Sequence, residues 1–159
     1  MEILFVLYNY LCIPVVLLFC LLLFLWFLHK KNKTLKQIEA VGNAIWDTSH
    51  EFLFLIDSSS HVVKTNFYSI FNLNKPSRRQ CFGDVMCCKY AAMMNACNKH
   101  DFCSLCPIRH KIRETLKTHK PFDNLEIVMD FGLPEKERGL YNMTVSGRYL
   151  LLGKKEYVF

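Results

Sequence analysis

Hydrophobic and polar positions divide the chain into two unequal parts. Residues 3–28 contain no charged side chain, and a helix of that length would extend roughly 39 Å at about 1.5 Å per residue. Because the hydrocarbon core of a bilayer is about 30 Å thick, residues 1–30 are predicted to form one transmembrane anchor. A cleaved signal peptide is disfavoured, since the chain lacks a basic start and the bulky Leu18 and Phe19 precede Cys20.

Apolar residues at helical spacing follow the basic segment that ends this anchor. Leu35, Ile38, Val41 and Ile45 recur at intervals of three, three and four, which is typical of a helix with one apolar face. Residues 31–50 are therefore predicted to be a juxtamembrane linker helix. Two roles stay open for it: a signalling or dimerising helix, or a short connector that packs on its own domain.

The next stretch predicts a hairpin and a short helix. An apolar run at residues 52–56, a polar turn at 57–60 and the segment 61–66 together favour two antiparallel strands. The residues after this hairpin predict a short helix with Phe67, Ile70 and Phe71 turned inward. A Lys-Pro-Ser sequence then ends this helix.

A longer helix and further strands are expected beyond the middle of the chain. The apolar face of the helix consists of Leu105, Ile108, Ile112 and Leu116, and the helix should end before Pro121. Strand is then predicted around residues 125–130, with more strand at 140–145 and 149–152 and a closing strand at 157–159 that is barely begun. Two strands, helices and three antiparallel strands place this part of the chain in the α+β class.

The charges predict how the chain is oriented in the membrane. Its formal net charge is +6, but only Glu2 precedes the anchor, whereas His29, Lys30, Lys31, Lys33 and Lys36 follow it. Lys and Arg resist translocation, so we expect the C-terminal domain on the cytoplasmic side of the inner cell membrane. The same lysines suit anionic lipid headgroups, and we therefore expect no binding to nucleic acid.

Residues 51–159 resemble a PAS domain. The resemblance rests on the order of elements, on the Phe54-Leu-Ile-Asp57 hairpin strand, and on Asn66 just before the first helix. The domain with its membrane helix and linker helix is similar to the front end of bacterial sensor histidine kinases. That resemblance implies a sensory function in signal transduction, a homodimer, and a kinase transmitter or other signalling protein as partner.

This chain departs from those kinases because nothing follows Phe159. We therefore expect no phosphoacceptor helix and no ATP-binding domain in it. His50 lies in a Ser-His-Glu sequence, but apolar strand residues follow it, so it is interpreted as a solvated loop residue. The chain has no Gly-rich phosphate loop and no His-Glu-x-x-His sequence, and we expect it not to be an enzyme.

Six of the eight cysteines lie in residues 78–106. Cytosolic cysteines stay reduced, so a dense set indicates metal binding or redox chemistry. Cys88, Cys97, Cys103 and Cys106 have the spacing C-x8-C-x5-C-x2-C, and four thiolates suffice for zinc or an iron-sulfur cluster. The sequence leaves both open, along with thiol redox switching and simple core packing.

Two details accompany this cysteine pattern. The closing Cys103-Ser-Leu-Cys106 should start a helix, whose N-terminus is expected to lower the pKa of the thiols. Cys81 and Cys87 are interpreted as core residues, and His100 and His110 as surface imidazoles.

The cysteine-rich insert resembles one found in a subset of sensor-kinase PAS domains. Those domains have Gly-Asp, a cysteine a few residues later, another cysteine and a closing C-x2-C, which Gly83-Asp84 and the four predicted ligands match. Ala96 and Pro107 stand where those relatives often have Gly. The resemblance implies a sensory site and does not decide its ligand.

Two other functions compete with a redox, oxygen or metal sensor. A membrane-anchored thiol oxidoreductase could use Cys103 and Cys106, but it would need a thioredoxin-like βαβ unit. A zinc-stapled interaction domain would use the metal for stability alone.

Overall fold

The protein forms two compact units, Met1–Ile45 and Trp46–Phe159, and each is described by itself. The computed structural model describes residues 2–134 and 136–159, with side chains described for residues 15–33 and from 35 onward in these ranges. The fold belongs to the α+β class, as predicted.

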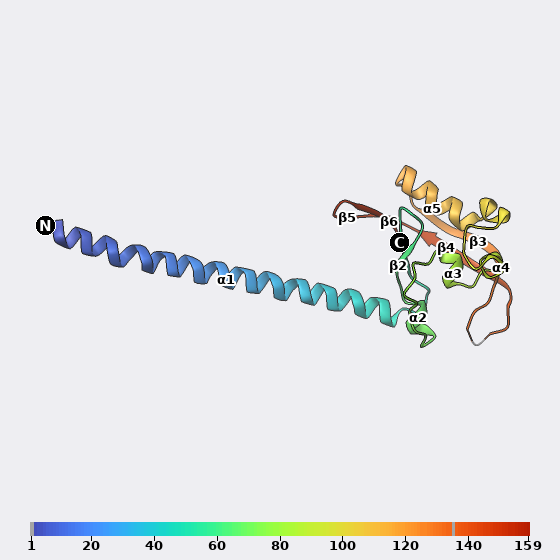
Figure 1. Cartoon of the computed structure of the whole chain (residues 1–159), viewed down its shortest axis with the longest axis horizontal. Helices are drawn as coiled ribbons and strands as arrows, with labels where there is room; N and C mark the ends of the chain where they lie inside the picture. The colour runs from blue at the N-terminus through green and yellow to red at the C-terminus, as the bar shows by residue number, and fades with distance from the viewer. Residues whose placement is uncertain (1, 135) are drawn as a thin grey trace. The chain divides into compact units, whose positions relative to one another are not determined.

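Helix α1 (Glu2–Thr48) is one unbroken helix (Figure 1). It forms the first unit as far as Ile45, and its last three residues belong to the second unit. It includes almost all of the predicted anchor and linker without a break between them. Within the described part of the chain, one helix is long and apolar enough to cross a membrane, with a candidate span from Val15 to Thr48. The four residues of the predicted apolar face, Leu35, Ile38, Val41 and Ile45, are exposed.

The second unit begins with the predicted hairpin. Strand β1 (Phe54–Asp57) pairs antiparallel with β2 (Val62–Thr65). The Oδ1 atom of Asp57 accepts the backbone N–H groups of Ser59 at 2.9 Å and His61 at 2.8 Å, and these bonds close the turn.

Helix α2 (Phe67–Ile70) lies where a short helix was predicted. Phe67 is buried, but the prediction for Ile70 was wrong, because its side chain is 38% exposed. The helix has a single turn, and the ring of Phe71 takes the place beside Phe67, with 5.0 Å between ring centroids.

Short helices occupy the cysteine-rich middle, where no hydrophobic period is visible along the chain. They are α3 (Phe82–Val85), α4 (Lys89–Met94) and the 3₁₀ helix η1 (Asp101–Leu105). Helix α5 (Pro107–Thr118) follows, with Ile108 and Ile112 buried as predicted. Leu105 was wrongly placed on its inner face, since it lies in η1 and is 70% exposed.

The remaining strands complete an antiparallel arrangement. They are β3 (Phe122–Phe131), β4 (Gly139–Gly147), β5 (Tyr149–Leu152) and β6 (Lys155–Val158). One sheet has the order β2-β1-β6-β5, and β3 pairs with β4 in the other. The closing strand β6 pairs on both sides, with β1 and β5, and so is more complete than the sequence pattern indicated.

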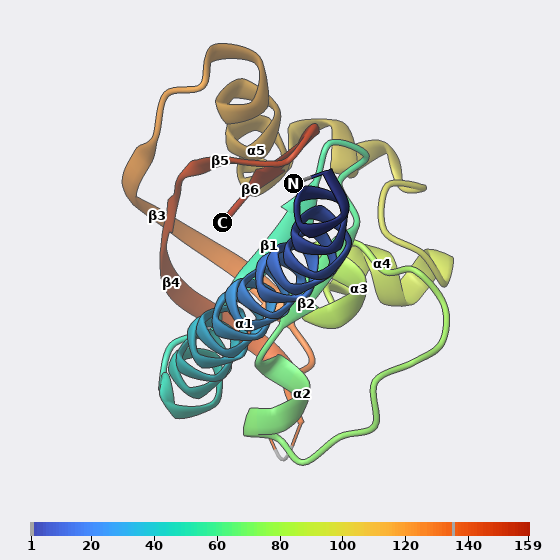
Figure 2. The same cartoon turned by 90° about the vertical axis from the view of Figure 1, so that its left-hand side faces the viewer.

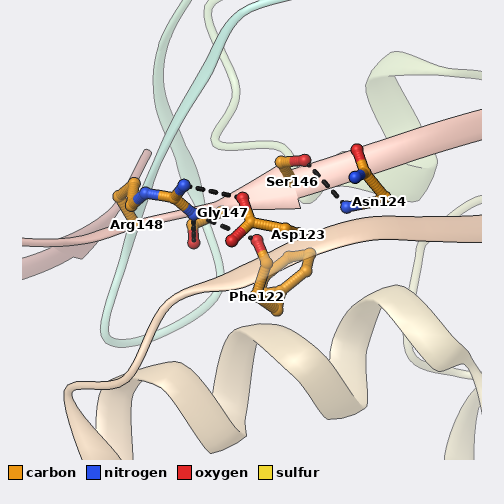
Figure 3. Close-up of polar contacts among 6 residues, drawn as sticks. All are labelled: Phe122, Asp123, Asn124, Ser146, Gly147 and Arg148. Carbon is orange, nitrogen blue, oxygen red and sulfur yellow. Dashed lines mark hydrogen bonds and ion pairs between the residues drawn. The ribbon is translucent and has the colours of Figure 1, made fainter.

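Only Arg148 separates strands β4 and β5, so the chain passes directly from one sheet into the other. The backbone N–H of Arg148 donates to the carbonyl of Phe159 at 2.7 Å, and Phe159 donates back at 2.9 Å. The guanidinium bonds the Asp123 carboxylate at 2.6 Å and the Phe122 carbonyl at 3.2 Å (Figure 3). Gly147 permits this bend, since a Cβ there would lie 2.4 Å from the Phe122 ring.

Two groups of buried side chains form the core of the second unit. Helix α5 packs on β3, β4 and β6 (Figure 2), and the core group beneath it consists of Ile56, Ile108, Ile112, Ile127 and Val158. The other group contains residues of the cysteine-rich insert, namely Val85, Met86, Cys88 and Ala91, together with Phe67, Phe131 and Leu133. The insert is therefore part of the hydrophobic core rather than a surface flap.

Candidate functional site

Five cysteine side chains line one cavity of about 390 Å³, beside the buried Arg109. The five are Cys81, Cys88, Cys97, Cys103 and Cys106. The four predicted ligands therefore all line this cavity, and Cys81 lines it too. Cys87 is exposed, so its interpretation as a core residue was wrong.

Short helices position these thiols around the cavity. Cys81, Cys88 and Cys106 each directly precede a helix, and Cys103 lies within η1. Cys97 lies in the loop after α4, between Asn95 and Asn98 in left-handed conformations, with φ of 54° and 75°. Asn tolerates such φ values better than most residues. The turns between short helices thus bring cysteines that are distant in sequence to one cavity.

A single carboxylate holds the backbones of two of the cysteines. Oδ2 of Asp84 accepts the N–H of Cys81 at 2.8 Å, and Oδ1 accepts the N–H of Cys97 at 2.6 Å. Gly83 beside it leaves room for the second thiol, since a Cβ at this position would lie 2.9 Å from Cys97 Sγ. The Gly83-Asp84 sequence therefore has a structural role at this site.

The pKa of the Cys97 thiol is lowered in this cavity. A hydrogen bond from the Cys81 thiol is the main reason that the pKa of Cys97 falls from 9.0 to about 6, against the opposing effect of burial. The backbone N–H of Gly83 and the guanidinium of Arg109 lower this pKa further. Cys81, as the donor, has its pKa raised in turn.

Burial has the largest effect on the thiols of Cys88 and Cys106, and it raises the pKa of each. At Cys88 the N–H groups of Tyr90 and Ala91 oppose this rise, and at Cys106 those of Arg109 and Ile108 do so. The prediction that the helix N-terminus would lower the pKa of Cys106 was therefore wrong, because loss of solvent outweighs the N–H groups.

Arg109 brings a buried positive charge to the cavity. It is 8% exposed, and its Nη2 lies 3.7 Å from Cys97 Sγ. A buried charge is stable only when it is paired, and this sulfur is the polar partner that the described residues provide. The cavity therefore suits a negatively charged group, such as one that is bound by thiolates. Arg109 was missed in the sequence, where no spacing distinguishes it from Arg113.

The thiols are not gathered around one point. In the described part of the chain, no three His, Cys, Asp or Glu side chains are arranged to hold a metal ion. A single zinc ion holds sulfurs at about 2.3 Å, which places them roughly 3.8 Å from one another.

The histidines near the cysteines do not line the cavity. His110 is exposed and its Nε2 bonds the carbonyl of Ser104 at 2.7 Å. His100 accepts the N–H of Phe102 at 3.2 Å and packs on the ring of Tyr90, with centroids 4.6 Å apart. The surface prediction holds for His110, whereas His100 belongs to a partly buried aromatic cluster.

Comparisons with known proteins add no assignment to this geometry. A scan against protein-family models, a search of curated proteins and a search of solved structures each found no match. The site must therefore be interpreted from its own residues.

Proposed function

We propose that the chain is a membrane-anchored PAS-type sensory module whose signal is the state of an iron-sulfur cluster held by Cys88, Cys97, Cys103 and Cys106. The proposal rests on one observation: these four thiols and the buried guanidinium of Arg109 line the same cavity. When bound, such a cluster supplies one-electron redox chemistry and sensitivity to oxygen.

The residues around the cavity suit that group. Arg109 would offset negative charge on a thiolate-bound cluster, and the N–H groups near Cys88 and Cys106 would stabilise ligating sulfurs. Zinc remains the alternative ligand, and it would act by stapling the fold. The thiol oxidoreductase alternative is weakened, because burial raises the pKa of Cys106 where that chemistry requires an acidic thiol.

The order of elements supports the PAS part of the proposal. A hairpin, short helices, one longer helix and antiparallel strands follow one another, and β6 returns beside β1. Helix α1 supports membrane anchoring by its length and composition. The basic residues from His29 to Lys36 favour a cytoplasmic location for the second unit, at the inner cell membrane.

Contacts within the second unit offer a route from the sensor domain to the end of α1. The ring of Trp46 packs on Phe159 at 5.5 Å, and Lys64 of β2 lies over the same ring at 4.9 Å. Asn66, only 2% exposed, accepts the N–H of Leu53 at 2.8 Å and donates to the carbonyl of Glu51 at 2.8 Å. A change in domain packing would therefore act on the segment that follows α1.

The output of this module would be a change in a dimer or in a signalling partner such as a kinase transmitter. The apolar face of Leu35, Ile38, Val41 and Ile45 supports a dimerising helix, because these side chains are exposed. Loss of the cluster would shift the population of ordered states in residues 78–106 and so bias that helix.

Air exposure of the anaerobically purified full chain in detergent should release the cluster and open the insert. Limited trypsin digestion can report this, because Arg109 is buried in α5 and should be cut slowly while the cluster is present. We expect cleavage after Arg109 to accelerate as visible absorbance falls. Lys154 is exposed in the turn between β5 and β6, outside the insert, and should be cut at the same rate before and after.

A Cys87→Ser variant is the matched control, since that exposed thiol does not line the cavity and its replacement should change neither signal. Bleaching without faster cleavage after Arg109 would contradict the sensory part of the proposal.

A further inference from the structure

Cys81 has no place among the four proposed ligands, yet it lies in the same cavity as Cys97. One carboxylate, that of Asp84, accepts the backbone N–H groups of both residues. A thiol held beside a proposed ligand can act on that ligand.

The backbones of both cysteines are held in place. Asp84 accepts the N–H groups of both residues, at 2.8 Å and 2.6 Å. Cys81 also forms an isolated β-bridge to His61, just before β2, and its carbonyl accepts the N–H of Asp84 at 3.0 Å. The fold therefore holds the backbones of both cysteines around one carboxylate.

We propose that Cys81 and Cys97 form a reversible disulfide when a hydroperoxide oxidises the cavity and Cys97 carries no cluster. The inference rests on the proposed function only in that a bound cluster would occupy Cys97. The pair is then an oxidation site that the four-cysteine pattern does not include.

The chemistry needs two thiols and one hydroperoxide. The sulfur of Cys97 attacks the terminal oxygen, the O–O bond breaks, and an alcohol, or water from hydrogen peroxide, leaves with the proton. The sulfur of Cys81 then attacks the Cys97 sulfenic acid, the S–O bond breaks, water leaves and the S–S bond forms. The two thiols lose two electrons and the peroxide gains them.

Local geometry favours this step. The two sulfurs need to close to about 2.05 Å, and the absence of a side chain on Gly83 leaves Cys97 space to move, since a Cβ there would lie 2.9 Å from its sulfur. Arg109 beside Cys97 also provides a positive charge near the attacking sulfur, at 3.7 Å.

The disulfide would remove one of the four proposed ligands. A chain that had lost its cluster to oxidation could not rebuild it until the bond was reduced, for example by a small thiol. The oxidation site would thus prolong the signal that cluster loss begins.

Peptide mapping of the full chain in detergent tests this. The protein is stripped of metal with a chelator under reducing conditions, exposed to hydrogen peroxide, and digested with trypsin and an enzyme that cuts before Asp. Cleavage before Asp84 separates Cys81, in residues 80–83, from Cys87 and Cys88, while Cys97 lies in residues 90–99. We expect these two peptides joined, and a reductant to separate them.

Two matched variants complete the experiment. Cys87→Ser should keep the joined peptides, whereas Cys81→Ser should lose them. No joined pair, or a link to another cysteine instead, would overturn the inference. A chain that never takes up iron but forms the link would refute the proposed cluster and uphold the oxidation site.

Discussion

Replacement of both Cys103 and Cys106 by serine in the full chain is expected to abolish binding of iron and acid-labile sulfide. Both thiols line the cavity, and the change would remove two of four proposed ligands. Serine is a poor ligand for soft metals compared with thiolate, and the substitutions change side-chain volume little. Elemental analysis after anaerobic purification, with circular dichroism to verify folding, measures the effect.

Cys87→Ser is the appropriate control, because it removes a cysteine one residue from Cys88 without altering the lining of the cavity. Full retention of iron by the Cys103→Ser, Cys106→Ser variant would refute the ligand assignment.

Alkylation of Cys97 in the cluster-free chain should depend on pH with a midpoint at about 6, because its pKa is lowered to about 6 from 9.0. Thiolate is the reactive form, so the rate should rise as pH increases through the midpoint and fall below it. Mass spectrometry of the tryptic peptide 90–99 after timed treatment with iodoacetamide measures the reaction at this residue.

Cys81→Ala should raise that midpoint, since the hydrogen bond from Cys81 is the main cause of the low pKa. At pH 7 the rate should fall by at least about tenfold, because each pKa unit above the pH lowers the thiolate fraction about tenfold. Cys81→Ser, which keeps a hydroxyl donor, should fall in between. Equal midpoints in all three proteins would show that the hydrogen bond has no such effect.

Local patterns predicted most of the elements, because each depends on residues close in sequence. The alternation of apolar and polar residues predicted β3, and the polar turn that begins at Asp57 predicted the hairpin. The helices of the insert have only four to six residues, too few for a hydrophobic period to be visible. Ile70 and Leu105 were misplaced for the same reason, since each lies at the end of a very short element.

The candidate site was predicted in part. The spacing of the cysteines and the expected reducing compartment were sufficient to select four cysteines that line one cavity. They could not indicate Cys81, whose role depends on the hydrogen bonds that its backbone N–H and that of Cys97 donate to Asp84. Nor could they indicate Arg109, because its burial depends on how α5 packs on the sheet. Such contacts join residues through the fold rather than through a sequence pattern.

The cluster itself is tested most directly by iron, sulfide and zinc analysis of the anaerobically purified full chain, together with its visible absorption spectrum. The account predicts iron and acid-labile sulfide in similar amounts, with a broad band near about 400 nm that bleaches in air. A colourless protein with stoichiometric zinc, or one without metal, would contradict it.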